Sequence, residues 1–177
     1  MIQTYVVILL LPKARGFNHS YYQPLHFAIL KGDWKSTKAF LDNNPTALTA
    51  KVTVYGRTAL HVAAVGAQWN LVEKLVEHMP ANMLTELDFM GCSCLHYVAM
   101  GESVNAAEAL VAKNPSVTQV TDFKGVTPLI YSITSTSKEM VSYILMNTTD
   151  ERPGCPFSGP SASQLVALLT AKGFYGK

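Results

Sequence analysis

The sequence predicts an all-α solenoid of about four stacked helix-turn-helix repeats, followed by a partial C-terminal helix. The first observation behind this prediction is a leucine that recurs with separations of 35, 35 and 34 residues. The second is that prolines keep the 35-residue step, while a glycine precedes each of the last three leucines by four residues. A fixed period of roughly 20–50 residues is typical of stacked repeats, because one hairpin cannot bury its apolar faces alone. The repeated positions are Leu25, Leu60, Leu95 and Leu129; Pro45, Pro80 and Pro115; and Gly56, Gly91 and Gly125.

The composition fits a folded domain of ordinary size. Of 177 residues, 49% are apolar and 15% are charged, which argues against global disorder. The 14 basic and 12 acidic side chains leave a net charge of +2, too small to predict a nucleic-acid or anionic-membrane partner. The longest apolar run, residues 5–11, is far shorter than the ~20 residues of a membrane-spanning helix. The odd cysteine count (Cys92, Cys94 and Cys155) fits reduced intracellular thiols better than a disulfide framework.

The first helix of each repeat is predicted to begin at a capping residue. Thr58 and Thr127 suit the N-cap, and Pro128 suits the first helical position, where its missing N–H costs little. Small residues such as Ala63 and Ala64 then allow this helix to pack closely against its neighbours. Each first helix is therefore expected to lie inside the stack.

A reversal and a second helix follow in each period. Glycine tolerates the left-handed geometry that such reversals use. The second helix, for example residues 70–78, carries apolar side chains at helical spacing, and a proline then ends it because proline cannot continue a helix. The turn glycines are Gly32, Gly66 and Gly101, of which Gly66 and Gly101 fall one position early in the repeat. The apolar side chains of the 70–78 helix are Leu71, Leu75 and Val76. Trp34 and Trp69 are expected to pack at the starts of second helices.

The register divides the chain into six segments. Residues 1–20 form an atypical leader that fits no repeat column and is expected to be a peripheral helix or strand, or disordered. The repeats are assigned to residues 21–52, as a capping unit, and to residues 53–87, 88–121 and 122–150. Residues 151–177 form a Pro/Gly/Ser-rich linker and one amphipathic helix.

The C-terminal helix is predicted to start with a capping box formed by Ser161 and Gln164. Leu165, Val166, Leu168 and Leu169 follow on one stripe, and Gly173 ends the helix. Two interpretations stay open: the helix begins a further repeat block, or it folds back onto the stack. Because solenoids normally end in polar caps, the polypeptide is expected to be a truncated form of something longer.

The repeated phrases resemble the ankyrin repeat over about residues 21–147. One motif behind this resemblance is Arg57-Thr-Ala-Leu-His-Val-Ala, which matches the family's Thr-Pro-Leu-His start. The other is the Asp-x-x-Gly turn, present as Asp88-Phe-Met-Gly91 and Asp122-Phe-Lys-Gly125. Thr53 stands where the second repeat should have its turn Asp, and Ile130 replaces the fourth repeat's His. The resemblance implies an ankyrin-repeat solenoid that recognises proteins and is not an enzyme.

A narrower resemblance points to plant ankyrin proteins that continue into a PGG domain of membrane-spanning helices. It is carried by Gly32-Asp33-Trp34, Phe40-Leu41-Asp42, Asn43-Asn44-Pro45 and Pro156-Phe157-Ser158-Gly159-Pro160. Members of that family typically lie at the plasma membrane, with their repeats on the cytoplasmic side, and are linked to stress and defence signalling. The chain lacks the membrane domain, so any membrane attachment is expected only through that missing domain.

Candidate catalytic and metal-binding residues have structural interpretations. His26, His61 and His96 occupy one repeat column, so stacking separates them by about 8–10 Å and points them the same way, which does not suit a shared zinc ion. In the ankyrin family this histidine typically hydrogen-bonds backbone of the adjoining turn. Cys94 stands in a packing column, and no phosphate-binding loop, nucleophile elbow or aromatic–basic alternation occurs. We therefore expect no enzyme activity, cofactor, metal or nucleic-acid partner.

The opening turns of the repeats offer the candidate binding surface. Their tips stand free of a helix stack, and aromatic, Met and Arg side chains are enriched in protein interfaces. The candidate partner-binding residues are Tyr55, Arg57, Phe89, Met90, Phe123, Lys124 and Val126. An equally supported alternative is that Phe89 and Phe123 pack on adjacent turns or under a terminal segment.

The sequence thus predicts a non-enzymatic protein-protein interaction module. Through the narrower resemblance, it predicts signalling in stress or defence at the cytoplasmic face of a plant plasma membrane, or a cytosolic location if the chain is complete as given. The alternative is the cytosolic regulatory part of a membrane-transport or channel-like protein.

Overall fold

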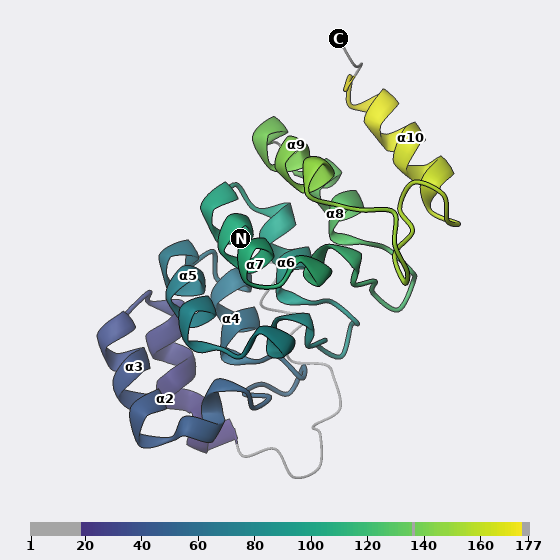
Figure 1. The fold of residues 1–177 in the computed structure, drawn as a ribbon. Coiled ribbons are helices and arrows are strands. Elements are labelled where there is room, and N and C mark those ends of the chain that lie inside the picture. The colour runs from purple at the N-terminus through teal and green to yellow at the C-terminus, as the bar shows by residue number, and fades with distance from the viewer. Residues whose placement is uncertain (1–18, 136, 175–177) are drawn as a thin grey trace.

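The computed structural model describes residues 19–135 and 137–174, so the predicted leader lies almost wholly outside the described residues (Figure 1). All regular elements of the described part are helical, which confirms the predicted all-α class. The α-helices are α2 (His19–Leu30), α3 (Trp34–Asn43), α4 (Ala59–Val65), α5 (Trp69–His78), α6 (Cys94–Met100), α7 (Val104–Lys113), α8 (Pro128–Thr134), α9 (Lys138–Met146) and α10 (Ala162–Ala171). Short 3-10 helices are η1 (Pro45–Leu48), η2 (Ala81–Thr85) and η3 (Pro115–Gln119).

The helices form hairpins that stack side by side in chain order, from α2 and α3 at one end to α8 and α9 at the other (Figure 1). The first helices pack in sequence, α2 on α4, α4 on α6 and α6 on α8, while α5 packs on α7 and α7 on α9. The four register leucines lie in these first helices, are at most 1% exposed, and belong to one continuous core. The equivalent surroundings of these leucines confirm the predicted solenoid.

The first helices begin largely as the sequence predicts. Thr58 is the N-cap of α4, and its hydroxyl accepts the N–H of His61 at 3.5 Å. Ala63 and Ala64 of the same helix are fully buried at the contacts with its neighbours. Thr127 precedes α8, and Pro128 occupies the first turn, but the Thr127 hydroxyl is buried and has no partner within the described part of the chain. The expected side-chain cap at Thr127 is therefore wrong, although the helix boundary is right.

The reversals between paired helices differ from the prediction in two repeats. Gly32 has the expected left-handed backbone, with φ +68°, but Gly66 and Gly101 have φ −79° and −86°. In the second repeat the left-handed residue is Ala67, at φ 54°. Gly101 is required for space instead, because a Cβ there would lie 2.5 Å from the ring of Trp69.

The second helices start and stop close to the predicted points. α5 begins one residue earlier than expected, at Trp69, and α3 begins at Trp34, which confirms the expected position of both tryptophans. Proline follows the end of α5 as Pro80 and starts 3-10 helices as Pro45 and Pro115, so each proline turns the chain toward the next repeat. The three apolar side chains assigned to the α5 core face, Leu71, Leu75 and Val76, are all buried.

The C-terminal helix α10 folds back onto the stack and packs on α8. Leu165 is 3% exposed and joins the core, whereas Val166 is 63% exposed and leaves the predicted stripe. Ser161 is the N-cap residue but makes no side-chain capping bond, so the predicted capping box with Gln164 is wrong. The Ser161 hydroxyl donates instead to the carbonyl of Gly125 at 3.3 Å, which ties α10 to the turn before α8.

Candidate functional site

The opening turns of the second, third and fourth repeats, residues 53–57, 88–92 and 122–126, share one local construction. Asp88 Oδ1 accepts backbone N–H groups two and four residues later at 2.8 and 3.1 Å, and Asp122 Oδ1 does the same at 2.8 and 2.9 Å. Thr53 Oγ1 accepts the equivalent groups at 3.3 and 3.1 Å. The threonine that departs from the repeat pattern thus fills the role of the aspartate. We call the row of these three turns the turn edge.

Each turn carries a glycine in the left-handed region, with φ of +70° at Gly56, +79° at Gly91 and +76° at Gly125. Residues with a Cβ pay for this conformation, so glycine is favoured in all three turns. In the third and fourth repeats the two residues before this glycine stand exposed at the tip, whereas Tyr55 of the second repeat is partly buried.

Aromatic rings at the tips lie on the glycines of the preceding turns. A Cβ at Gly56 would be 2.4 Å from the ring of Phe89, and a Cβ at Gly91 would be 2.8 Å from the ring of Phe123. The N–H of Phe89 also donates to the carbonyl of Tyr55 at 2.8 Å. Yet Phe89 remains 60% exposed and Phe123 remains 73% exposed. Packing on the adjacent turn and exposure therefore coexist in both rings.

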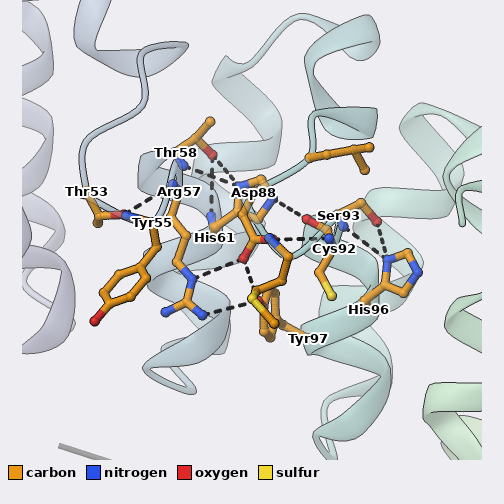
Figure 2. A network of polar contacts seen from close by, with 12 residues as sticks. Thr53, Tyr55, Arg57, Thr58, His61, Asp88, Cys92, Ser93, His96 and Tyr97 are labelled. Atoms are coloured by element: carbon orange, nitrogen blue, oxygen red, sulfur yellow. Dashed lines mark hydrogen bonds and ion pairs between the residues drawn. The ribbon is translucent and has the colours of Figure 1, made fainter. Parts of the chain in front are cut away.

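Behind the tips, Asp88 is the centre of a polar network that joins two repeats (Figure 2). Arg57 Nε donates to Asp88 Oδ2 at 3.3 Å, Arg57 Nη2 donates to the hydroxyl of Tyr97 at 3.2 Å, and that hydroxyl donates to Asp88 Oδ2 at 2.5 Å. The guanidinium carbon lies 5.3 Å from the ring centroid of Tyr55 and 5.1 Å from that of Tyr97, a cation–π arrangement. Arg57 therefore braces the turn edge from within.

The electrostatics of this network keep the ion pair charged. Burial acts to raise the pKa of Asp88, but hydrogen bonds from Tyr97, from two backbone N–H groups and from Arg57 outweigh it and lower that pKa. Burial likewise acts to lower the pKa of Arg57, and interactions with Tyr97 and Asp88 raise it overall. The Asp88 side chain has no exposed surface and that of Arg57 is 21% exposed. One partner cannot be removed without leaving the other charge poorly compensated.

The next repeat boundary carries a reduced form of the same network. The hydroxyl of Tyr131 donates to Asp122 Oδ2 at 2.9 Å, and Cys92 replaces the arginine, with its Sγ 3.5 Å from that hydroxyl. Sequence reasoning missed the roles of Tyr97 and Tyr131, although both follow a register leucine by two residues. That shared offset is the signal that could have identified them.

The register histidines act as links between repeats. His61 Nδ1 accepts the N–H of Thr58 at 3.4 Å, while Nε2–H donates to the carbonyl of Cys92 in the next turn at 3.1 Å. His96 makes the equivalent bond to the carbonyl of Val126 at 3.1 Å. Burial lowers the pKa of His61 to about 4 and also lowers that of His96. For these two histidines, the expected bond to the adjoining turn is confirmed.

The buried cysteines have the character of packing residues. Cys94 is 1% exposed, its Sγ lies 3.8 Å from the carbonyl of Leu60, and burial raises its pKa. Burial also raises the pKa of Cys92. A thiol with a raised pKa is a weak nucleophile, because the thiolate is the reactive form. Within the described ranges, no group of three His, Cys, Asp or Glu side chains could hold a metal ion.

The seven predicted site residues divide into two sets at the turn edge. Four are exposed at the tips and three are partly buried behind them, with Val126 packed against the core. The exposed set is Phe89, Met90, Phe123 and Lys124, and the partly buried set is Tyr55, Arg57 and Val126. The fold therefore brings all seven onto one edge, at two depths.

A helical-hairpin solenoid with Asp-type opening turns and histidine links defines the class of repeat-built recognition modules. The chain contains ankyrin repeats: a family model described as "Ankyrin repeats (3 copies)" matches residues 66–152. A search of curated proteins found no match. Ankyrin repeats indicate a protein-protein interaction module, and no catalytic family is indicated. No helix of the residues described here is long and apolar enough to cross a membrane.

Proposed function

We propose that the turn edge binds a protein partner and that this chain acts as a non-enzymatic recognition module. The observation that supports the proposal is a row of large apolar side chains in contact with solvent: Phe89 is 60% exposed, Met90 61% and Phe123 73%. Aromatic residues and methionine are enriched in interfaces, and adjacent exposed apolar side chains are typical of interaction surfaces. Hydrogen bonds within each turn and ring contacts with the neighbouring turn also hold the exposed tips in place.

Each predicted residue then has a distinct part in binding. Phe89, Met90 and Phe123 supply apolar contact area, and Lys124 supplies an exposed cation at the end of the row. Tyr55, Arg57 and Val126 lie behind the tips and hold them in place. Arg57 is already paired with Asp88, so a partner gains little charge attraction from it.

The test is affinity capture from cell extract with the wild-type chain and with the double variant Phe89→Ala/Phe123→Ala. We expect the double variant to lose most of the captured protein, because removing both rings removes the largest exposed apolar area of the edge. The matched control is Met146→Ala, since Met146 is 84% exposed on α9, away from the turn edge.

Helical circular dichroism must be unchanged in both variants for the comparison to count. Equal capture by wild type and by the double variant would contradict the proposal. Loss of capture in the Met146→Ala control would also contradict it, because binding would then use the α9 face. Loss of helical signal in the double variant would mean that the two rings belong to the core and not to a binding surface.

For the cellular setting we propose stress or defence signalling at the cytoplasmic face of a plant plasma membrane, with attachment through a PGG domain outside this chain. The support is the resemblance of residues 32–34, 40–45 and 156–160 to that family. Reading the transcript beyond codon 177 and imaging the fluorescently tagged full product test it. Spanning helices and plasma-membrane fluorescence are expected, and a product without either contradicts this setting.

A further inference from the structure

The three turn glycines have the same backbone conformation but differ in whether a side chain packs over them. Gly56 and Gly91 are buried, each beneath the phenylalanine ring of the following turn, whereas Gly125 is exposed. Apart from its own chain neighbours, no atom of residues 19–135 and 137–174 lies within 4 Å of the point where a Cβ of Gly125 would stand. The glycine surface of the last turn is therefore exposed, whereas the equivalent surface in the two earlier turns binds a phenylalanine ring.

The covered turns show what this site accepts. At Gly56 the occupant is the flat ring of Phe89, which approaches so closely that a Cβ on the glycine would be 2.4 Å from it. The same occupant donates its backbone N–H to the carbonyl of Tyr55, the residue before the glycine, at 2.8 Å. At Gly56, a ring and the N–H of the same residue thus form one docking unit. In the fourth repeat the carbonyl at the equivalent position belongs to Lys124.

The Gly125 turn is held in shape for such an occupant. Asp122 fixes its backbone through two hydrogen bonds, and the hydroxyl of Ser161 holds the carbonyl of Gly125 from the side of α10. The ring of Phe123, two residues before Gly125, lies on Gly91 and is 73% exposed. An incoming aromatic side chain would therefore meet a preformed glycine surface.

We propose that the Gly125 turn is a docking site for a phenylalanine in a segment of a partner protein. Its ring covers Gly125, and its backbone N–H donates to the carbonyl of Lys124. The occupant's chemistry comes from the chain itself, which twice fills the equivalent site with a phenylalanine that follows an aspartate, Asp88-Phe89 and Asp122-Phe123. This inference rests on the proposed function of the turn edge, because it names where on that edge one partner residue binds.

The probe is a capped peptide with the sequence of residues 86–93 carrying Cys92→Ser, titrated into the isotope-labelled full chain and followed by NMR. NMR is chosen because one ring and one hydrogen bond form a weak complex. We expect the amide signals of Gly125 and Lys124 to move in a saturable way. The control peptide carries Phe89→Ala and should bind at least about tenfold more weakly, because its ring is missing.

Two protein variants locate the site. Gly125→Ala places a methyl group where the ring should lie, so peptide binding should fall at least about tenfold. Since the backbone there has φ +76°, circular dichroism and thermal unfolding must confirm that this variant is folded. Met146→Ala changes an exposed side chain on α9 and should bind the peptide within about twofold of wild type.

Two results of the titration would overturn the inference: equal binding of the two peptides, or signal changes centred away from Gly125. A third would be movement of the Gly125 signal when the protein alone is concentrated, because the occupant would then be a second copy of the chain. Its failure is distinguishable from failure of the proposed function. If the peptide does not bind but capture still depends on Phe89 and Phe123, only the Gly125 site is wrong. If capture is also insensitive to those rings, the recognition role of the edge is wrong.

Discussion

The stability of the stack should fall in mild acid because of His61. The folded chain holds this histidine neutral, with Nδ1 accepting from the backbone of Thr58 and Nε2–H donating to Cys92. Burial lowers its pKa to about 4 from 6.5 in an unfolded chain; nearby Asp88 opposes the shift, and Lys51 and Arg57 add to it. A proton on Nδ1 would end its role as acceptor and place a charge inside the stack, away from water.

The sign and size of the effect follow from these two pKa values. Above pH 6.5 both states are neutral at His61, so the full stability is present. As pH falls below 6.5, the unfolded chain binds a proton that the folded chain does not, and stability is lost until the pH passes about 4. Between pH 7.5 and 5 the loss comes to about 2 kcal/mol, since each pKa unit is worth about 1.4 kcal/mol. His96, whose pKa is also lowered, adds to it.

The assay is urea unfolding at a series of pH values for the wild type and for His61→Gln, which keeps a donor and an acceptor but cannot titrate. The variant is expected to be less stable at pH 7.5 and to lose less stability on going to pH 5. His78→Gln is the matched control, because His78 is exposed on α5. An unchanged pH slope in His61→Gln would refute the assignment of the acid sensitivity to this residue.

Two further changes test the packing and the turns. Leu95→Ala, at a fully buried site in α6, should cost about 2–5 kcal/mol in the free energy of unfolding through the cavity it leaves, and unchanged thermal stability would contradict the stacked-helix assignment. Ala67→Gly should instead raise the free energy of unfolding by about 1 kcal/mol, because it removes a Cβ from a left-handed backbone at φ 54°. Denaturant unfolding measures this gain, and a loss of stability would show that the contacts of the alanine methyl group outweigh its backbone strain.

The sequence predicts those features of the fold that depend on residues within one repeat and that recur in every repeat. The spacing of the register leucines sets the stack, and the leucines are buried as predicted. The prolines that follow α3, α5 and α7 mark where the first three hairpins end. These features can be predicted because every repeat buries an equivalent residue at the same position. Leu95, for example, aligns with a buried leucine in each of the other repeats.

Features that depend on one contact between neighbours were predicted less well. The repeat pattern predicts a left-handed reversal near Gly101, yet the small size of this glycine is needed because the ring of Trp69 lies against it. Thr127 has the right residue type for a side-chain cap but does not make one, and Ser161 bonds across to Gly125 instead of capping α10. Single positions of this kind are decided by side chains from another repeat, which no local pattern contains.

The candidate site shows the same division. The seven edge residues could be chosen from the register, but their depth could not, because Arg57 is drawn inward by Asp88 and Tyr97, which come from the next repeat. The two interpretations of Phe89 also could not be separated from sequence. The ring is large enough to cover a glycine with one face and remain 60% exposed.

A solenoid built in this way completes each turn with a side chain from the turn that follows. Phe89 covers Gly56, and Phe123 covers Gly91. Gly125 is left exposed because the segment that follows its repeat, residues 150–160, has a different construction and supplies no such ring. Asp150 Oδ1 accepts N–H groups seven and eight residues later, at 2.9 and 3.2 Å, so the tip it shapes is wider than those shaped by Asp88 and Asp122. A partner segment that imitates the missing tip would repeat the contact of a ring on a glycine that the fold already makes twice. This is why a phenylalanine peptide taken from the chain's own third repeat is the sharpest probe of its binding surface.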